Sequence, residues 1–118
     1  MNKASNGAGK DTASDILARL FEVIESRRGG DPESSYTAKL LAAGKPEIAR
    51  KVGEEATEVL TAALAEGRAE VIAESADLMY HLMVLWAAEG IQPGEVWAEL
   101  ARREGISGIE EKRSRGKS

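Results

Sequence analysis

Two long stretches of helical periodicity meet at Gly67, and they constrain the fold of this 118-residue chain more than any other feature. The first begins near Pro46, a residue that suits the first turn of a helix, and runs for about twenty residues, or roughly 30 Å. The second runs from about Arg68 to Glu89 and ends at Gly90. If the chain bends at Gly67, the two helices fold back on each other as an antiparallel hairpin.

Three shorter helices are expected beside this pair, and no segment has the pattern of a strand. Apolar residues recur at helical spacing over residues 14–28, with Thr12 or Ser14 available as the N-cap. A short apolar helix is expected over residues 36–43, and a last one between residues 93 and 105, which are proline and glycine. The sequence therefore predicts an all-α protein.

The chain is long enough for one domain but too short for two. We assign residues 14–105 to an all-α bundle of four to five helices. Residues 1–13 are small and polar without periodicity, which is typical of a flexible extension. Residues 106–118 form a polar basic tail.

Composition excludes several classes of protein. The chain is 42% hydrophobic and 31% charged but only 4% aromatic, which indicates a globular domain with an aliphatic core. The absence of cysteine excludes disulfides, zinc ribbons and thiol catalysis. We see neither an apolar leader nor a run long enough to span a bilayer, so we expect a cytoplasmic protein without a membrane partner.

The net charge of −4 is unevenly distributed. Both ends of the chain are basic, whereas residues 54–77 contain seven acidic residues and a single base, Arg68. Such a segment repels nucleic acid and attracts cations. The bases of the tail are not accompanied by aromatic residues that could stack on nucleotides, so we expect no nucleic-acid partner.

Four acidic residues are placed to converge across the hairpin. Glu55 and Glu58 are three apart on its first helix, and Glu74 and Asp77 are three apart on its second, so each pair shares a helix face. In an antiparallel hairpin bent at Gly67, residues whose numbers add to the same total lie level with each other. This rule pairs Glu58 with Glu74 and Glu55 with Asp77, roughly 12–16 Å from the bend.

Acidic residues on helices most often form a solvated face, and that interpretation applies to any one of these four. As a group they differ from a usual solvated face, in which acids have basic neighbours one turn away. Only Glu55 has such a neighbour, at Lys51, and there is no lysine or arginine three or four residues from Glu58, Glu74 or Asp77. A cysteine-free set of carboxylates prefers hard, oxygen-binding ions. We therefore expect Mg²⁺, with Mn²⁺ as a substitute, held by Glu55, Glu58, Glu74 and Asp77.

The same register places Lys51 level with His81, one turn beyond Glu55 and Asp77. Both side chains could reach a bound phosphate, although a single histidine is more often structural. The second helix of the hairpin is also apolar on most of its remaining faces, and so small a chain has too few helices to bury it. We therefore expect a homodimer that completes the bundle.

Four segments of the sequence carry a resemblance to a known family. They are SYTAKLL (35–41), KVGEEATEV (51–59), ESADLMYHLMVL (74–85) and SGIEEKRSR (107–115). The second and third contain the EExxE and ExxD pattern of the MazG-like all-α nucleotide pyrophosphohydrolases. Together the four resemble the phosphoribosyl-ATP pyrophosphohydrolases of histidine biosynthesis, over about residues 14–115.

The resemblance implies a magnesium-dependent dimer that hydrolyses phosphoribosyl-ATP to phosphoribosyl-AMP and pyrophosphate. In this mechanism Glu55 and Glu58 are metal ligands with a catalytic role, and Glu54 orients or deprotonates the attacking water. An exposed helical glutamate is the alternative interpretation of Glu54. The expected substrate-binding residues are Ser35, Tyr36, Thr37, Lys39, Lys51 and His81.

The chain departs from the family pattern at residues 1–13 and at Ser75, where a small apolar residue is expected. Some members are fused to the cyclohydrolase that acts next. This chain has no such domain, so a separate phosphoribosyl-AMP cyclohydrolase is a candidate partner. Two other functions stay open at this point. One is hydrolysis of ordinary or damaged nucleoside triphosphates, and the other is a non-catalytic dimerisation module with a structural ion.

Overall fold

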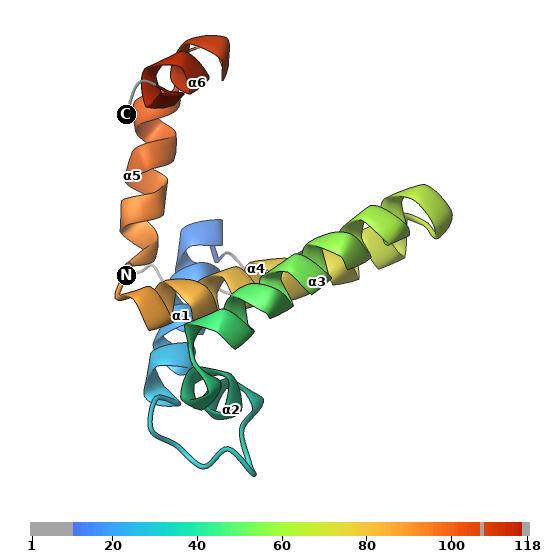
Figure 1. The fold of residues 1–118 in the computed structure, drawn as a ribbon, viewed down its shortest axis with the longest axis vertical. Coiled ribbons are helices and arrows are strands. Elements are labelled where there is room, and N and C mark those ends of the chain that lie inside the picture. The colour runs from blue at the N-terminus through green and yellow to red at the C-terminus, as the bar shows by residue number, and fades with distance from the viewer. Residues whose placement is uncertain (1–10, 107, 117–118) are drawn as a thin grey trace.

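A computed structural model of the chain describes residues 11–106 and 108–116, and within these residues the protein contains helices and no strand (Figure 1). The all-α prediction is therefore confirmed. The helices are α1 (Ala13–Ser26), α2 (Tyr36–Ala43), α3 (Lys45–Ala65), α4 (Arg68–Glu89), α5 (Pro93–Arg103) and α6 (Gly108–Gly116).

The bend predicted at Gly67 is present. Helix α3 ends at Ala65, and α4 begins directly after Gly67, whose backbone is extended. The two helices lie side by side along their length and form the longest feature of the molecule (Figure 1). At the other end of α4, Gly90 adopts a left-handed conformation with φ 74°, and the Ile91 amide donates to the Trp86 carbonyl. This cap stops α4 and turns the chain into α5.

Most of the predicted extension, residues 1–10, lies outside the described residues. Its last residues are part of the folded protein. Thr12 caps α1, because its hydroxyl accepts from the Asp15 amide while the Asp15 carboxylate accepts from the Thr12 amide. Asp11 makes an ion pair of 3.0 Å with Arg19.

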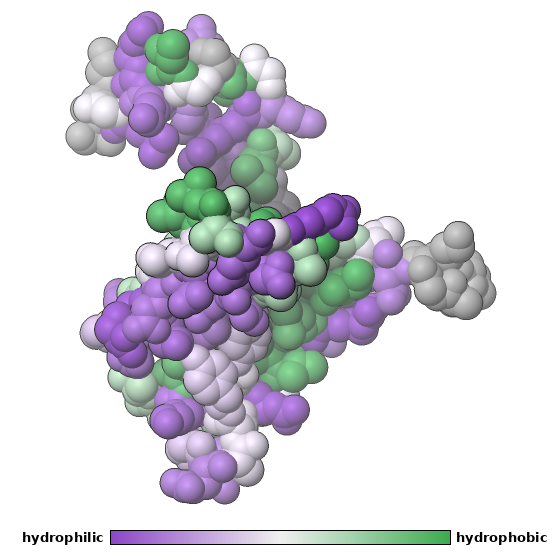
Figure 2. All heavy atoms as spheres, turned by 90° about the vertical axis from the view of Figure 1, so that its right-hand side faces the viewer, coloured by the Kyte–Doolittle hydropathy of each residue, from purple (hydrophilic) through white to green (hydrophobic). Residues whose placement is uncertain are grey.

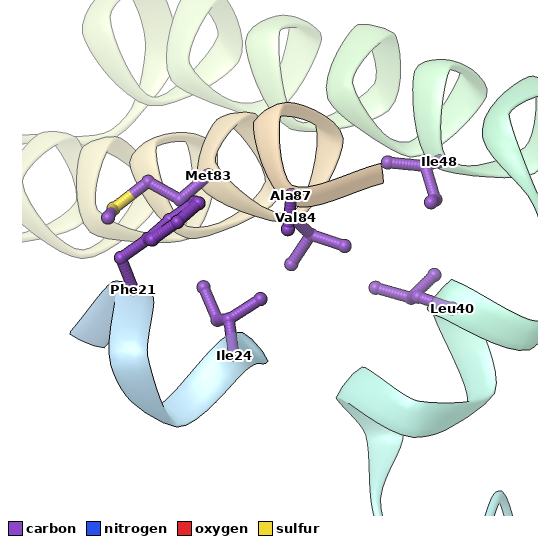
Figure 3. Close-up of a cluster of buried hydrophobic side chains, with 7 residues drawn as sticks. All are labelled: Phe21, Ile24, Leu40, Ile48, Met83, Val84 and Ala87. Atoms are coloured by element: carbon purple, nitrogen blue, oxygen red, sulfur yellow. The ribbon is translucent and has the colours of Figure 1, made fainter. Parts of the chain in front are cut away.

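The core lies at the end of the hairpin remote from Gly67 (Figure 3). It is made by buried side chains from α1, α2, α3 and α4: Phe21, Ile24, Leu40, Ile48, Met83, Val84 and Ala87. Helices α1 and α2 cover only this part of the hairpin. Nearer the bend, large apolar side chains stay exposed, with 57% of Leu60, 79% of Leu64 and 56% of Ile72 accessible. Within one chain, therefore, the buried side chains of α4 are all in its C-terminal half, from His81 to Ala87.

The basic tail contains a sixth helix, α6, which the sequence pattern did not indicate. The segment lacks an apolar stripe, so its periodicity gives no signal. The helix is held instead by ion pairs. The Glu111 carboxylate, buried between α5 and α6, lies 2.8 Å from Arg102 and 3.2 Å from Arg115.

Candidate metal centre

Three of the four predicted carboxylates converge at the seam between α3 and α4. Glu55 comes from α3, and Glu74 and Asp77 come from successive turns of α4; an oxygen from each lies within 4.8 Å of the others. The helices place them there because an unbroken antiparallel pair keeps residues in register on either side of Gly67. The side chain of Glu55 is only 14% exposed, so the cluster is at the edge of the core.

Glu58 is the exception. It is exposed and does not belong to this close group, although its charge acts on Glu74. It lies nearer the bend than Glu55, toward the part of the hairpin that α1 and α2 leave uncovered (Figure 1). The structure thus brings three of the four residues together and leaves the fourth at the open rim.

The cluster carries more negative charge than its neighbours neutralise. Burial and the nearby charges of Asp77, Glu58 and Glu55 raise the pKa of Glu74. Among the described residues, the nearest cation is Lys51, whose ammonium lies 3.9 Å from the Glu55 carboxylate. Like charges held this close favour binding of a cation.

Lys51 is itself held by Glu54 through a hydrogen bond of 3.1 Å, which raises the pKa of the lysine. The same hydrogen bond, together with the charge of Arg50, lowers the pKa of Glu54. Glu54 also accepts from Arg50, which is paired in turn with Glu47. The sequence analysis did not single out Arg50, although its spacing of four residues from Glu54 is a recognisable signal.

His81 is buried, and both of its ring nitrogens have protein partners. Nδ1 lies 2.8 Å from the main-chain carbonyl of Asp77, and Nε2 lies 3.0 Å from the hydroxyl of Tyr36. A carbonyl oxygen can only accept, so Nδ1 must carry a proton and donate. In the neutral ring, Nε2 then accepts a hydrogen bond from the Tyr36 hydroxyl. His81 therefore links α2 to the turn of α4 that presents Asp77.

The other predicted substrate-binding residues lie on α2 or at its start. The Ser35 hydroxyl caps α2 by accepting from the Ala38 amide, and Thr37 shares a hydrogen bond with Tyr80. Tyr80 was not foreseen, because its partner is distant in the sequence. Beside these residues is a pocket of about 380 Å³. It is lined by Tyr36, Lys39, Leu40, Ala43, Glu47, Arg50 and Lys51.

The donor set fits a hard divalent cation. All three close ligands are carboxylates, which Mg²⁺ and Mn²⁺ prefer. Ligand oxygens around Mg²⁺ are about 3 Å apart when adjacent and about 4.2 Å apart when opposite, so oxygens within 4.8 Å of one another would need to close by up to about 2 Å. The residues present therefore suit magnesium.

Comparison with known proteins gives consistent matches. The family model described as phosphoribosyl-ATP pyrophosphohydrolase matches residues 17–104. A phosphoribosyl-ATP pyrophosphatase of Paramagnetospirillum magneticum is 61% identical over 104 residues, which cover 88% of this chain and 95% of the relative. Proteins of the same name from Novosphingobium aromaticivorans and Azospirillum brasilense are 59% and 54% identical, over 86% and 85% of this chain and 94% and 90% of the relatives.

Proposed function

Because the chain belongs to the phosphoribosyl-ATP pyrophosphohydrolase family, we propose that its carboxylate cluster holds Mg²⁺, or Mn²⁺ as a substitute, for the family's reaction. That reaction, the enzyme's activity, is the hydrolysis of phosphoribosyl-ATP to phosphoribosyl-AMP and pyrophosphate in histidine biosynthesis. The observation that carries the metal proposal is the close approach of three carboxylates at the helix seam, with Lys51 beside only one of them.

Glu55, Glu74 and Asp77 hold the ion from the seam, and Glu58 completes the donor set from the exposed rim. Bound there, Mg²⁺ supplies charge neutralisation for the polyphosphate and lowers the pKa of a bound water. Glu55 and Glu58 keep the catalytic role expected of them, because they lie on the helix that also carries Lys51. Glu54, with its lowered pKa, is a weak proton acceptor. We assign it the positioning of Lys51 rather than the removal of a proton from water.

The substrate lies between the cluster and the pocket beside α2. Lys51 is next to Glu55 and also lines this pocket, so its ammonium can bind a phosphate oxygen. Tyr36 and Lys39 line the pocket and contact the nucleotide or ribose. We assign an indirect role to Ser35, Thr37 and His81, because their hydrogen bonds hold α2 and Tyr36 in place beside the substrate.

A homodimer completes the fold. Leu60, Ile72 and Met79 form an exposed apolar stripe on one face of the hairpin, which a second copy covers. By length and composition alone α4 would also pass for a membrane-spanning helix. It packs along α3, however, and carries Glu74 and Asp77 near its middle, so we assign it to a bundle. We place the enzyme in the cytoplasm, with a phosphoribosyl-AMP cyclohydrolase as the candidate partner that uses its product.

The substrate and the metal are tested together by measuring pyrophosphate release from phosphoribosyl-ATP, ATP and dUTP, each with magnesium and with EDTA. We expect cleavage of phosphoribosyl-ATP that depends on magnesium, and at least about a hundredfold lower kcat/KM for the two plain triphosphates. EDTA should stop the reaction, and added Mg²⁺ or Mn²⁺ should restore it.

Cleavage of phosphoribosyl-ATP that continues unchanged in EDTA, after removal of bound metal, would contradict the metal proposal. A preference for dUTP or ATP would instead indicate that the pocket beside α2 selects a different nucleotide.

A further inference from the structure

Helix α5 rises from the apolar face of the hairpin. Ile72, Met79 and Trp86 are each seven residues apart on α4 and therefore lie on one stripe. Trp97 of α5 packs on Trp86 at a ring-centroid distance of 5.8 Å, with the rings nearly perpendicular. Figure 2, which looks along the hairpin from its bend, shows hydrophobic side chains on the upper side of the near end, below the α5–α6 arm. The arm and the dimerisation stripe thus share a side of the molecule.

The carboxylate cluster lies on the opposite side. Glu74 and Asp77 each precede or follow a stripe residue by two positions, which is about 200° around a helix. If a second copy covers the stripe of the first, each copy therefore presents its own carboxylates on the outer face of the pair. In a symmetric dimer the arm of one copy rises past the hairpin of the other.

The dimensions allow the arm to reach that outer face. Packed helices are about 8–10 Å apart, whereas the 11 residues of α5 extend about 16 Å. Helix α6 stands at the far end of α5 (Figure 1). In the dimer it would lie beyond the partner's hairpin. Asp77 is near the middle of α4, so the partner's Asp77 would lie at about the same level along the hairpin, roughly 14 Å from Trp86, on which α5 packs. The nine residues of α6 extend about as far.

The arm is held in one shape by its own ion pairs. The Glu111 side chain is 7% exposed and is contacted by Arg102, Arg103 and Arg115, at 2.8, 3.6 and 3.2 Å. Hydrogen bonds from Arg102 and Arg103 also lower the pKa of Glu99 to about 2. These contacts fix α6 relative to α5, so α6 is presented as a preformed unit.

Helix α6 also carries the complementary charge. Lys112 and Arg113 are exposed, and neither makes an ion pair with another residue that the structure describes. The hairpin segment that they would face contains seven acidic residues and one base over residues 54–77. A second copy of this chain is therefore the partner whose chemistry matches the arm.

We propose that α6 of one subunit closes over the carboxylate centre of the other, and that Lys112 and Arg113 contact the polyphosphate of the substrate bound there. Each active site is then composite, with the carboxylates from one chain and these two cations from its partner. The inference rests on the proposed metal centre and dimer, and adds to them the origin of two substrate contacts.

The test is complementation between two defective subunits. One is Glu55→Gln, which keeps the arm, and the other is Lys112→Glu/Arg113→Glu, which keeps the carboxylates and the Glu111 ion pairs. We expect the arm variant alone to raise KM at least about tenfold while remaining dimeric. Arg27→Glu reverses an exposed charge at the C-cap of α1 and serves as the control, with KM unchanged.

Heterodimers carrying different affinity tags are then purified after co-expression. A composite site predicts about half of wild-type activity per heterodimer at low substrate, because one of the two sites is intact. Activity no greater than the mean of the two parents would place the arm in its own chain, and would overturn the proposal. A wild-type KM for the arm variant, or a monomeric wild-type protein, would also overturn it. If Glu55→Gln itself stays active, the metal proposal fails instead.

Discussion

Glu74→Gln is expected to lower kcat/KM for phosphoribosyl-ATP by about a thousandfold, while making the metal-free protein more resistant to heat. The activity falls because the variant removes a ligand charge from the seam. The stability rises because the same change removes a charge that is disfavoured by burial and by repulsion from Asp77, Glu58 and Glu55. Both effects raise the pKa of Glu74 in the folded protein. An ordinary structural glutamate would not give these two opposite effects.

The stability difference should depend on pH. Because the pKa of Glu74 is higher in the folded chain than in the unfolded one, the folded chain holds this proton more tightly. The favourable contribution is fully present below the ordinary glutamate pKa of 4.5 and is lost as the pH rises through the folded-state pKa. The metal-free wild type should therefore lose Tm relative to Glu74→Gln as the pH is raised from about 4 to 7.

Thermal melts in EDTA measure this difference, and Glu22→Gln on the exposed side of α1 controls for a change of one charge. Added magnesium should raise the Tm of the wild type and have little effect on that of Glu74→Gln. Full activity in Glu74→Gln, or a lower Tm in EDTA, would remove Glu74 from the metal centre.

Ile72→Glu is expected to convert the proposed dimer to monomers and to abolish most of the activity. Ile72 is 56% exposed in the single chain and lies level with Leu60 on the apolar stripe, so a charge there would be buried against the second copy. We expect the dissociation constant of the dimer to rise at least about a hundredfold, as measured by sedimentation velocity.

Ile16→Glu is the matched control, because Ile16 is 49% exposed on α1 and lies away from the stripe. It should sediment as the wild type does. If Ile72→Glu stays dimeric with normal activity, the stripe is not the interface, and the composite site inferred for α6 loses its geometric basis.

The register of the hairpin explains why part of the carboxylate cluster could be predicted from the sequence. An antiparallel pair with a single bend leaves few alternatives for which residues lie level, so the approach of Glu55, Glu74 and Asp77 followed from their numbers alone. The bounds of α2 and α4 also agree with the sequence pattern, because each helix ends at a glycine, Gly44 or Gly90. Exposure of Glu58 could not be foreseen, since it depends on how far α1 and α2 extend along the hairpin.

Contacts between distant segments were beyond the sequence pattern as well. The bond between Tyr36 and His81 joins residues 45 positions apart, and the bond between Thr37 and Tyr80 spans 43. Helix spacing carries no information about which α2 side chain meets α4. Helix α6 was missed for a different reason. It has no apolar stripe, and the buried carboxylate of Glu111 holds it against α5 instead.

The most direct test of the metal centre is anomalous scattering from crystals of the active protein soaked in Mn²⁺. We expect an anomalous peak at the seam of α3 and α4, within about 2.0–2.3 Å of carboxylate oxygens from Glu55, Glu74 and Asp77. A peak only at other residues, or none in crystals of protein that turns over phosphoribosyl-ATP with Mn²⁺, would contradict the metal proposal.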